Sequence, residues 1–166
     1  RSKKIMVRKG ILLAGGNGSR LYPITKSISK HLLPIYDKPM IYYSISTLML
    51  AGIRDILILT DEDNHKNYKK LLGNGSQFGI KIKYKIQKKA DGIVAALLLC
   101  EKFINNKKIC LMLGDNIFYG EAIGKTLLDV EKNKNGATVF AYKVSDPENY
   151  GIINFNNKNE PTSIVE

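Results

Sequence analysis

The chain has 166 residues, of which 44% are hydrophobic and 25% charged, a composition ordinary for a globular domain with one apolar core. No stretch approaches the roughly 18 uninterrupted apolar residues that a membrane span needs, and no cleavable signal pattern opens the sequence, so we expect no membrane partner. The net charge is +11, but only four of the 26 basic residues are arginine and the lysines are spread along the chain.

This basic excess is typical of a solvated surface, and any functional share would favour small polyanions such as nucleoside triphosphates and sugar phosphates. The lysines do not interleave with aromatic residues as in a nucleic-acid stacking platform, and we therefore expect no nucleic-acid partner. A steep salt dependence of DNA binding would favour the opposite interpretation.

The two cysteines, Cys100 and Cys110, both lie in apolar runs. Buried free thiols are favoured over a disulfide or a metal pair, and free thiols are typical of a reducing cytoplasm. We expect a cytoplasmic protein.

Apolar strands alternate with amphipathic helices along the chain. The expected order is strand 9–14, helix 39–51, strand 55–60, helix 63–72, strand 80–86, helix 92–103, strand 108–113, helix 121–133, strand 137–144, and a hairpin-like piece over 150–156 and 163–166. This alternation predicts an α/β fold with a doubly wound, mostly parallel sheet covered by helices on both faces, in a single domain over residues 1–166.

Polar candidates follow four of these strands. The loop 15–20 follows the first strand, Gln87 follows 80–86, Asp115 follows 108–113, and Tyr150 and Gly151 come after 137–144. Because ligands of open α/β sheets bind outside the carboxyl ends of the strands, we expect these positions to share one rim.

The loop 15–20 reads Gly-Gly-Asn-Gly-Ser-Arg. Its glycines let backbone N–H groups approach an anion, and Arg20 offers a planar charged fork for phosphate. A second cation, Lys30, follows ten residues later on a proline-bounded segment. The loop is neither a dinucleotide fingerprint, since Leu21 stands where a third glycine is needed, nor a P-loop. A simple tight turn remains the alternative.

The run from Gly10 to Asp55 resembles the sugar-phosphate nucleotidyltransferases, most closely their glucose-1-phosphate thymidylyltransferase branch. The family pattern GGxG(S/T)RLxPxT followed by KxLLPI appears here as GGNGSRLYPIT and KHLLPI. Further matching segments span residues 33–43, 46–55, 73–79 and 113–120. The resemblance implies a Rossmann-like fold of the nucleotide-diphospho-sugar transferase type and covers nearly the whole chain.

The resemblance also implies the reaction. The phosphate oxygen of glucose 1-phosphate attacks the α-phosphorus of dTTP and pyrophosphate leaves, giving dTDP-glucose in the first step of dTDP-sugar synthesis, such as that of dTDP-rhamnose. The implied cofactor is Mg²⁺, and the implied assembly of the complete enzyme is a homo-oligomer, commonly a tetramer.

The site residues implied by the matched motifs fall into four groups. They are Arg20 and Lys30 for catalysis; Gly15, Gly16, Gly18, Ser19, Gln87 and Gly92 for the nucleotide; Asn116, Tyr150, Gly151 and Glu166 for the sugar; and Asp115 for the metal. Plainer alternatives stay open: Arg20 could satisfy carbonyls of its own loop, Lys30 could be a surface lysine, and Asp115 could be a helix N-cap.

The sequence departs from the family pattern near the expected nucleotide. His31 stands where the family usually has glutamine, residues 92–96 read Gly-Ile-Val-Ala-Ala in place of Gly-Leu-Ala-Gln-Ala, and residues 88–90 lack the usual proline. These changes leave base preference and catalytic competence open.

The last matched position is Glu166, after which the family continues with Lys-Pro and a second metal-binding aspartate. We therefore expect a nucleotide-binding core truncated at its C-terminus, with an incomplete sugar-binding portion. The alternative to an active enzyme is an impaired fragment that only binds nucleotide or nucleotide-sugar.

Overall fold

The computed structural model describes residues 8–16, 18–89, 91–130 and 136–165. The chain divides into two compact units, Arg1–Asp129 and Val130–Glu166, which are described separately. No helix among the described residues is long and apolar enough to cross a membrane.

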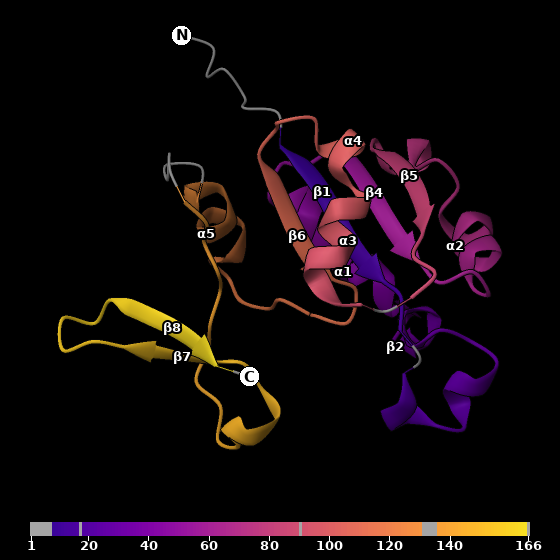
Figure 1. The fold of residues 1–166 in the computed structure, drawn as a ribbon. Helices are drawn as coiled ribbons and strands as arrows, with labels where there is room; N and C mark the ends of the chain where they lie inside the picture. Colours follow the sequence, from indigo (N-terminus) through magenta and orange to yellow (C-terminus); the bar gives the residue numbers. More distant parts are fainter. Residues whose placement is uncertain (1–7, 17, 90, 131–135, 166) are drawn as a thin grey trace, which may run out of the picture. The chain divides into compact units, whose positions relative to one another are not determined.

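A four-stranded parallel sheet forms the centre of the first unit (Figure 1). Its strands are β1 (Lys9–Ala14), β4 (Asp55–Thr60), β5 (Lys81–Ile86) and β6 (Ile109–Leu113), in the spatial order β5-β4-β1-β6. The chain first adds β4 and β5 on one side of β1 and then crosses back to add β6 on the other. The point where the order reverses, between β1 and β6, is where open α/β sheets bind ligands.

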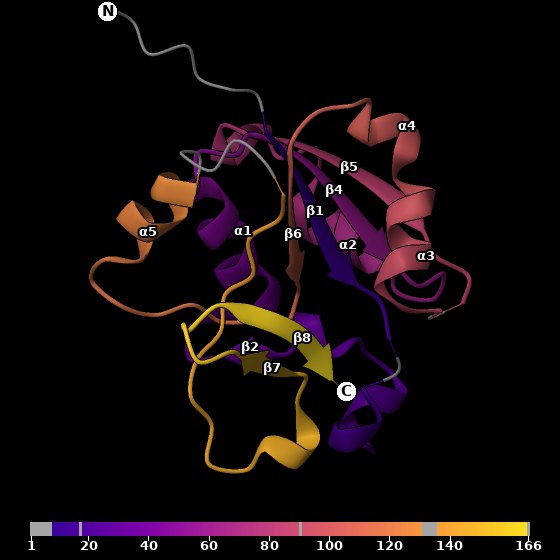
Figure 2. The ribbon, with the colours of Figure 1, turned by 60° about the vertical axis from the view of Figure 1, so that its left-hand side comes forward.

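Side chains alternate between the two faces of this sheet, as the pleat of a strand requires. Leu12 of β1 packs with α1 (Met40–Leu50), α2 (His65–Leu72) and α5 (Ile123–Asp129) on one face. Ile11 packs with α3 (Gly92–Leu99) and Cys100 on the other. Figures 1 and 2 show α1 and α3 on opposite sides of the sheet. The expected doubly wound, mostly parallel sheet is confirmed.

The edge strand β5 explains part of the lysine pattern. Its odd positions, Lys81, Lys83 and Lys85, are exposed, while Ile82 and Tyr84 pack toward the core. The Nζ of Lys85 donates to the carbonyl oxygen of Leu99 at 2.6 Å. Lysines on an edge strand disfavour pairing with the edge of another sheet. The alternation of lysine with apolar residues is therefore explained by the position of β5 at the edge of the sheet.

Short elements connect these strands and helices. They are the 3-10 turns Ser19–Leu21, Ile24–Lys26, Lys30–Leu32 and Ser76–Phe78, the short antiparallel pair β2 (Pro34–Ile35) and β3 (Lys38–Pro39), and α4 (Glu101–Ile104). The second unit contains a 3-10 turn, Pro147–Asn149, and an antiparallel hairpin of β7 (Ile152–Phe155) and β8 (Pro161–Val165).

Three sequence expectations need correction. The helix expected over 92–103 is broken at Cys100 into α3 and α4, and the helix expected from 39 begins at Met40 because Pro39 is extended and pairs with Pro34. The strand expected over 137–144 is wrong: these residues form no regular element and are mostly exposed. An alternation of apolar and polar residues forms a strand only where a neighbouring strand is available for pairing. No described strand pairs with residues 137–144. Residues 131–133 of the expected helix 121–133 lie outside the described part.

Both cysteines are free thiols, Cys100 buried and Cys110 partly buried, as expected. They lie in the apolar packing of the two sheet faces, where burial raises the pKa of each thiol.

One buried hydroxyl joins three parts of the first unit. The Oη of Tyr68, on α2, donates to the carbonyl oxygen of Ala14 at 2.9 Å and lies 2.8 Å from Ser29 Oγ. Tyr68→Phe should lower the free energy of unfolding by about 1–3 kcal/mol, since buried acceptors would lose their donor. Urea unfolding checks this, with Tyr119→Phe at a fully exposed tyrosine as the control. Equal stability of the two variants would contradict it.

Candidate nucleotide-binding site

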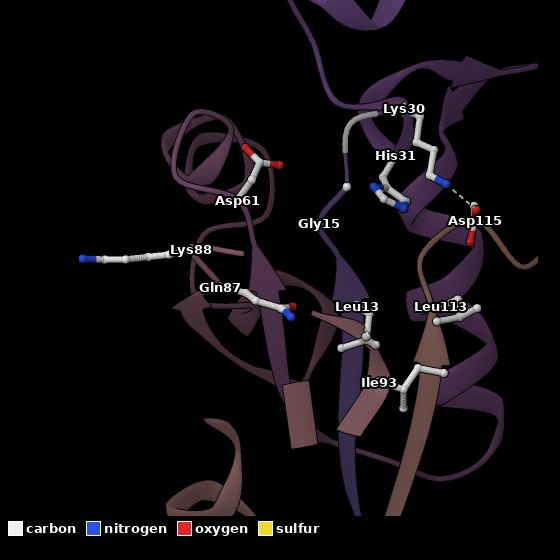
Figure 3. Close-up of a pocket in the computed structure, with 12 residues that line it drawn as sticks. Leu13, Gly15, Lys30, His31, Asp61, Gln87, Lys88, Ile93, Leu113 and Asp115 are labelled. Atoms are coloured by element: carbon white, nitrogen blue, oxygen red, sulfur yellow. Dashed lines mark hydrogen bonds and ion pairs between the residues drawn. The ribbon is translucent and has the colours of Figure 1, made fainter. Parts of the chain in front are cut away.

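A cavity of about 300 Å³ lies at the carboxyl end of the parallel sheet (Figure 3). This volume is at the lower end of the range for small-molecule pockets, roughly 300–1,000 Å³. Its lining comes from the ends of β1 and β6 and from segments that follow all four strands, the start of α3 included. The lining residues are Leu13, Gly15, Gly16, Lys30, His31, Asp61, Gln87, Lys88, Gly92, Ile93, Leu113 and Asp115.

The cavity brings together part of the predicted site. The predicted residues in its lining are Gly15, Gly16, Lys30, Gln87, Gly92 and Asp115. Gly18, Ser19, Arg20 and Asn116 lie in the adjoining loops, outside the lining. Tyr150 and Gly151 belong to the second unit, and Glu166 lies outside the described residues.

The glycine-rich loop owes its shape to Gly18. This residue has φ +56°, and a Cβ on it would lie 2.8 Å from Thr25 Cγ2. Thr25 Oγ1 donates to the carbonyl oxygen of Gly18 at 2.8 Å. Only glycine fits this combination of a left-handed backbone and a close neighbour. Arg20 is exposed just beyond it, and no described hydrogen bond joins its side chain to a carbonyl of the loop.

Lys30 and Asp115 form an ion pair at the cavity wall, with 2.6 Å between Lys30 Nζ and Asp115 Oδ2 (Figure 3). Partial burial works to raise the pKa of Asp115, but the hydrogen bond and charge of Lys30 outweigh it and the net pKa is lowered. Asp115 is therefore an anion and Lys30 is tied to it. No helix begins at Asp115, because α5 starts only at Ile123, and the N-cap interpretation is wrong.

The loop that carries Asp115 is held from below by α1. Ser44 is buried and its Oγ donates to the carbonyl oxygen of Gly114 at 2.9 Å. A Cβ on Gly114 would lie 2.7 Å from His31 Cδ2 and 2.9 Å from the carbonyl oxygen of Leu13. His31 and Asp115 are thus set side by side by close packing at a glycine.

His31 is almost fully buried, and its Nδ1 lies 3.1 Å from Ser29 Oγ and 3.2 Å from Tyr68 Oη. Burial and the positive charge of Lys30 lower the pKa of His31 to about 4, against opposing contributions from Asp115 and Asp61. The imidazole is therefore neutral at neutral pH.

Sequence reasoning missed several lining residues. Leu13, Leu113 and Ile93 supply apolar walls, and Asp61 adds a carboxylate directly after β4. The rule that found Gln87 and Asp115, a polar residue following a strand, would also have found Asp61. His31 and Lys88 had been noted only as departures from a pattern.

The described residues contain no group of three or more His, Cys, Asp or Glu side chains that could hold a metal by themselves. Asp115 is the one carboxylate beside Lys30 in the lining. A magnesium site with few protein ligands is common where substrate phosphates supply the others, so the residues fit Mg²⁺ only together with a bound triphosphate.

Comparisons with known proteins show which family and which solved structures the chain resembles. The sequence profile of the Nucleotidyl transferase family matches residues 9–166. A glucose-1-phosphate thymidylyltransferase of Neisseria meningitidis serogroup A is 54% identical over 158 residues, covering 95% of this chain and 55% of the relative. The chain thus spans about half the length of the curated relatives it matches.

Two solved structures share the fold. The glucose-1-phosphate thymidylyltransferase of Bacillus anthracis in complex with sucrose matches with a TM-score of 0.90 and 42% identity, over 96% of this chain and 64% of that chain. A UDP-glucose pyrophosphorylase complexed with UDP-glucose matches with a TM-score of 0.60 and 27% identity, over 76% and 54%.

The buried neutral imidazole makes stability depend on pH. The unfolded chain binds a proton at His31 below about pH 6.5, whereas the folded chain does so only below about pH 4. Lowering the pH through this window should therefore reduce the free energy of unfolding by about 3 kcal/mol from this group. Chemical unfolding at a series of pH values checks this: His31→Gln should flatten the slope and His65→Gln should largely keep it. The same slope in His31→Gln would contradict the burial of a neutral His31.

Proposed function

Because the chain belongs to the Nucleotidyl transferase family, we propose that it transfers a thymidylyl group from dTTP to glucose 1-phosphate, giving dTDP-glucose and pyrophosphate. The observation that carries the proposal is the shared cavity in which the Lys30–Asp115 pair, Gln87 and Gly92 meet. A phosphate-binding cation, a metal-binding carboxylate and a base-reading amide are the groups that this chemistry needs.

In the proposed reaction a phosphate oxygen of glucose 1-phosphate attacks the α-phosphorus of dTTP, and the bond to the leaving pyrophosphate breaks. Such in-line displacement depends on positioning and on neutralising crowded negative charge. Lys30 would donate to the α-phosphate and the incoming sugar phosphate, and exposed Arg20 would hold the outer phosphates. When bound, Mg²⁺ would supply charge neutralisation between Asp115 and the phosphate oxygens.

The ion pair of Lys30 and Asp115 suits this role. Without substrate each group neutralises the other, which keeps both ordered at the cavity wall. A triphosphate with bound Mg²⁺ would offer Lys30 a phosphate anion in place of Asp115. It would offer Asp115 a cation in place of Lys30. Exchange of partners, rather than desolvation of free charges, lowers the cost of binding.

The base would be read at the opposite end of the rim. Gln87 follows the edge strand β5 and presents both a donor and an acceptor, as the Watson–Crick edge of a pyrimidine requires. Gly92, with φ +86° and no neighbour within 4 Å of an added Cβ, leaves space for the base against the backbone. Gly15 and Gly16 would contact the nucleoside from β1, and Gly18 and Ser19 the phosphates.

The glucose would be held by Asn116, Tyr150, Gly151 and Glu166, all carried over from the family pattern. The family further suggests Mg²⁺ as cofactor, a tetrameric complete enzyme in the cytoplasm, and a place at the first step of dTDP-sugar synthesis such as that of dTDP-rhamnose. The UDP-glucose bound to one structural neighbour supports a nucleotide-sugar product in a site of this kind.

A second candidate is nucleotide binding without turnover. It is favoured by the single carboxylate beside Lys30 in the cavity. The nucleotide half of the site would then bind while the acceptor sugar is poorly held.

Arg20 should act on the outer phosphates only. Arg20→Ala is expected to weaken binding of dTTP roughly tenfold, the loss of one charge-assisted contact, and to leave dTMP nearly unchanged. Calorimetry with both nucleotides checks this, with Lys26→Ala as the control at an exposed cation of the same segment. Equal losses of affinity for dTTP and dTMP would show that Arg20 does not contact the outer phosphates. If the folded parent chain does not bind dTTP, the proposed function is overturned.

Asp115 should couple Mg²⁺ to the nucleotide. In the parent chain Mg²⁺ should raise the affinity for dTTP, and Asp115→Asn should reduce this gain at least tenfold, because an amide is a poor Mg²⁺ ligand. Any pyrophosphate release with glucose 1-phosphate should fall by orders of magnitude. Asp37→Asn is the matched control, since Asp37 pairs with Lys38 at 2.8 Å on the exposed surface. A Mg²⁺ effect that survives Asp115→Asn would exclude Asp115 as the metal ligand.

A further inference from the structure

The segment that carries Asp115 lies at the surface of the first unit. Residues 115–117 are exposed, and the chain between β6 and the start of α5 at Ile123 forms no regular element. The side chain of Asp115 nevertheless has a defined direction, toward Lys30 Nζ at 2.6 Å on the cavity wall (Figure 3). Another part of the fold must therefore fix the backbone at this position.

Ser44 of α1 contacts the backbone on both sides of Asp115. Its Oγ donates to the carbonyl oxygen of Gly114 at 2.9 Å and lies 3.4 Å from the carbonyl oxygen of Asn116. One hydroxyl proton can be shared between two carbonyl oxygens in this way, and the shorter contact is the stronger. Because these carbonyl groups belong to the residues before and after Asp115, their direction helps to set the direction in which its side chain leaves the chain.

The hydroxyl of Ser44 is itself held in a fixed place. Ser44 is fully buried, and its neighbours on α1, Ile45 and Leu48, belong to the apolar core on that face of the sheet. From the other side, the backbone N of Gly114 donates to the carbonyl oxygen of Leu13 at 2.8 Å. The turn after β6 is thus fastened to α1 and to β1 at once.

We propose that Ser44 is a positioning residue of the metal site, because it holds the Asp115 carboxylate in the direction that Mg²⁺ and the nucleotide phosphates require. The inference rests on the proposed function, in which Asp115 binds Mg²⁺. The ion demands near-ideal octahedral geometry, so it depends on how its ligand is oriented. Removing a group that orients a metal ligand typically costs about 10–100-fold in metal affinity or activity.

The plain alternative is that Ser44 only fastens α1 to the end of β6. Loss of its hydroxyl would then lower the stability of the fold and leave the effect of Mg²⁺ on dTTP binding unchanged. Thr47 is a matched reference for this alternative. It is also buried on α1, but its Oγ1 donates to the carbonyl oxygen of Tyr43 at 3.0 Å, within the same helix.

The test compares Ser44→Ala with Thr47→Val on the full chain. Each change removes one buried hydroxyl and adds no bulk, and alanine favours a helix, so both variants should fold, which their thermal transitions check. Calorimetry measures the affinity for dTTP with saturating Mg²⁺ and with EDTA. The ratio of the two affinities is the Mg²⁺ gain.

Ser44→Ala should reduce the Mg²⁺ gain about tenfold, because the carboxylate is still present but is no longer held in one direction. Its affinity for dTTP in EDTA should stay within twofold of the parent. Thr47→Val should keep the Mg²⁺ gain within twofold. Ser44→Cys, which places a weaker donor at the same position, should give a gain between those of the parent and of Ser44→Ala.

A Mg²⁺ gain in folded Ser44→Ala within twofold of the parent would overturn the inference, and so would an equal reduction in Thr47→Val. If Ser44→Ala does not fold, an unchanged gain in Ser44→Cys overturns it instead.

The same measurements separate this inference from the proposed function. If the folded parent does not bind dTTP, the proposed function fails and the role of Ser44 fails with it. If Asp115→Asn removes the Mg²⁺ gain while Ser44→Ala retains it, the proposed function stands and only the role of Ser44 is removed.

Discussion

The buried contact among Tyr68, Ser29 and His31 determines how the site is built, because it ties three chain-distant segments at the carboxyl end of β1. Tyr68 comes from α2, Ser29 from the turn before Lys30, and the carbonyl oxygen that Tyr68 binds belongs to the last residue of β1. A buried polar atom without a hydrogen-bond partner destabilises the folded state, so each broken hydrogen bond of this arrangement costs free energy. The segment that carries Lys30 is thereby fixed on the rim.

The position of Lys30 follows from this constraint, and so does the electrostatics of the cavity. With His31 packed on Gly114, Lys30 reaches Asp115 and forms a close ion pair at a partly exposed wall. The same packing leaves His31 neutral, since a second positive charge beside Lys30 in a buried place is unfavourable. One cation, one anion and one neutral imidazole thus lie next to each other: Lys30 and His31 belong to the same 3-10 turn, and Asp115 follows β6.

The proposed chemistry divides along the rim of the sheet. In the proposed reaction Gln87, after the edge strand β5, would read the base, the glycines after β1 would contact the nucleoside, and Asp115, after β6, would bind the metal. This division needs the reversal of strand order between β1 and β6, which opens the sheet at that point. All residues that line the cavity belong to the first unit.

Much of this organisation follows from the sequence by itself. The apolar runs ending in Ala14 and Thr60 predict the first and last residues of β1 and β4 correctly, because a buried parallel strand must be apolar on both faces. The resemblance to sugar-phosphate nucleotidyltransferases rests on local sequence motifs and is confirmed by the family match. The glycines of these motifs are required by the local backbone: Gly18 has a positive φ and lies against Thr25.

The tertiary structure decided what depends on a partner. The alternating segment 137–144 forms no strand, because pairing requires a free edge and the sequence does not say where one is. Asp115 pairs with Lys30 across 85 positions of chain instead of capping a helix, and Asp61 joins the cavity because β4 ends beside β1. His31 is buried by contacts with Ser29 and Tyr68 that only folding brings together. Local conformation is encoded by neighbours in the chain, whereas charge pairing and burial depend on neighbours in space.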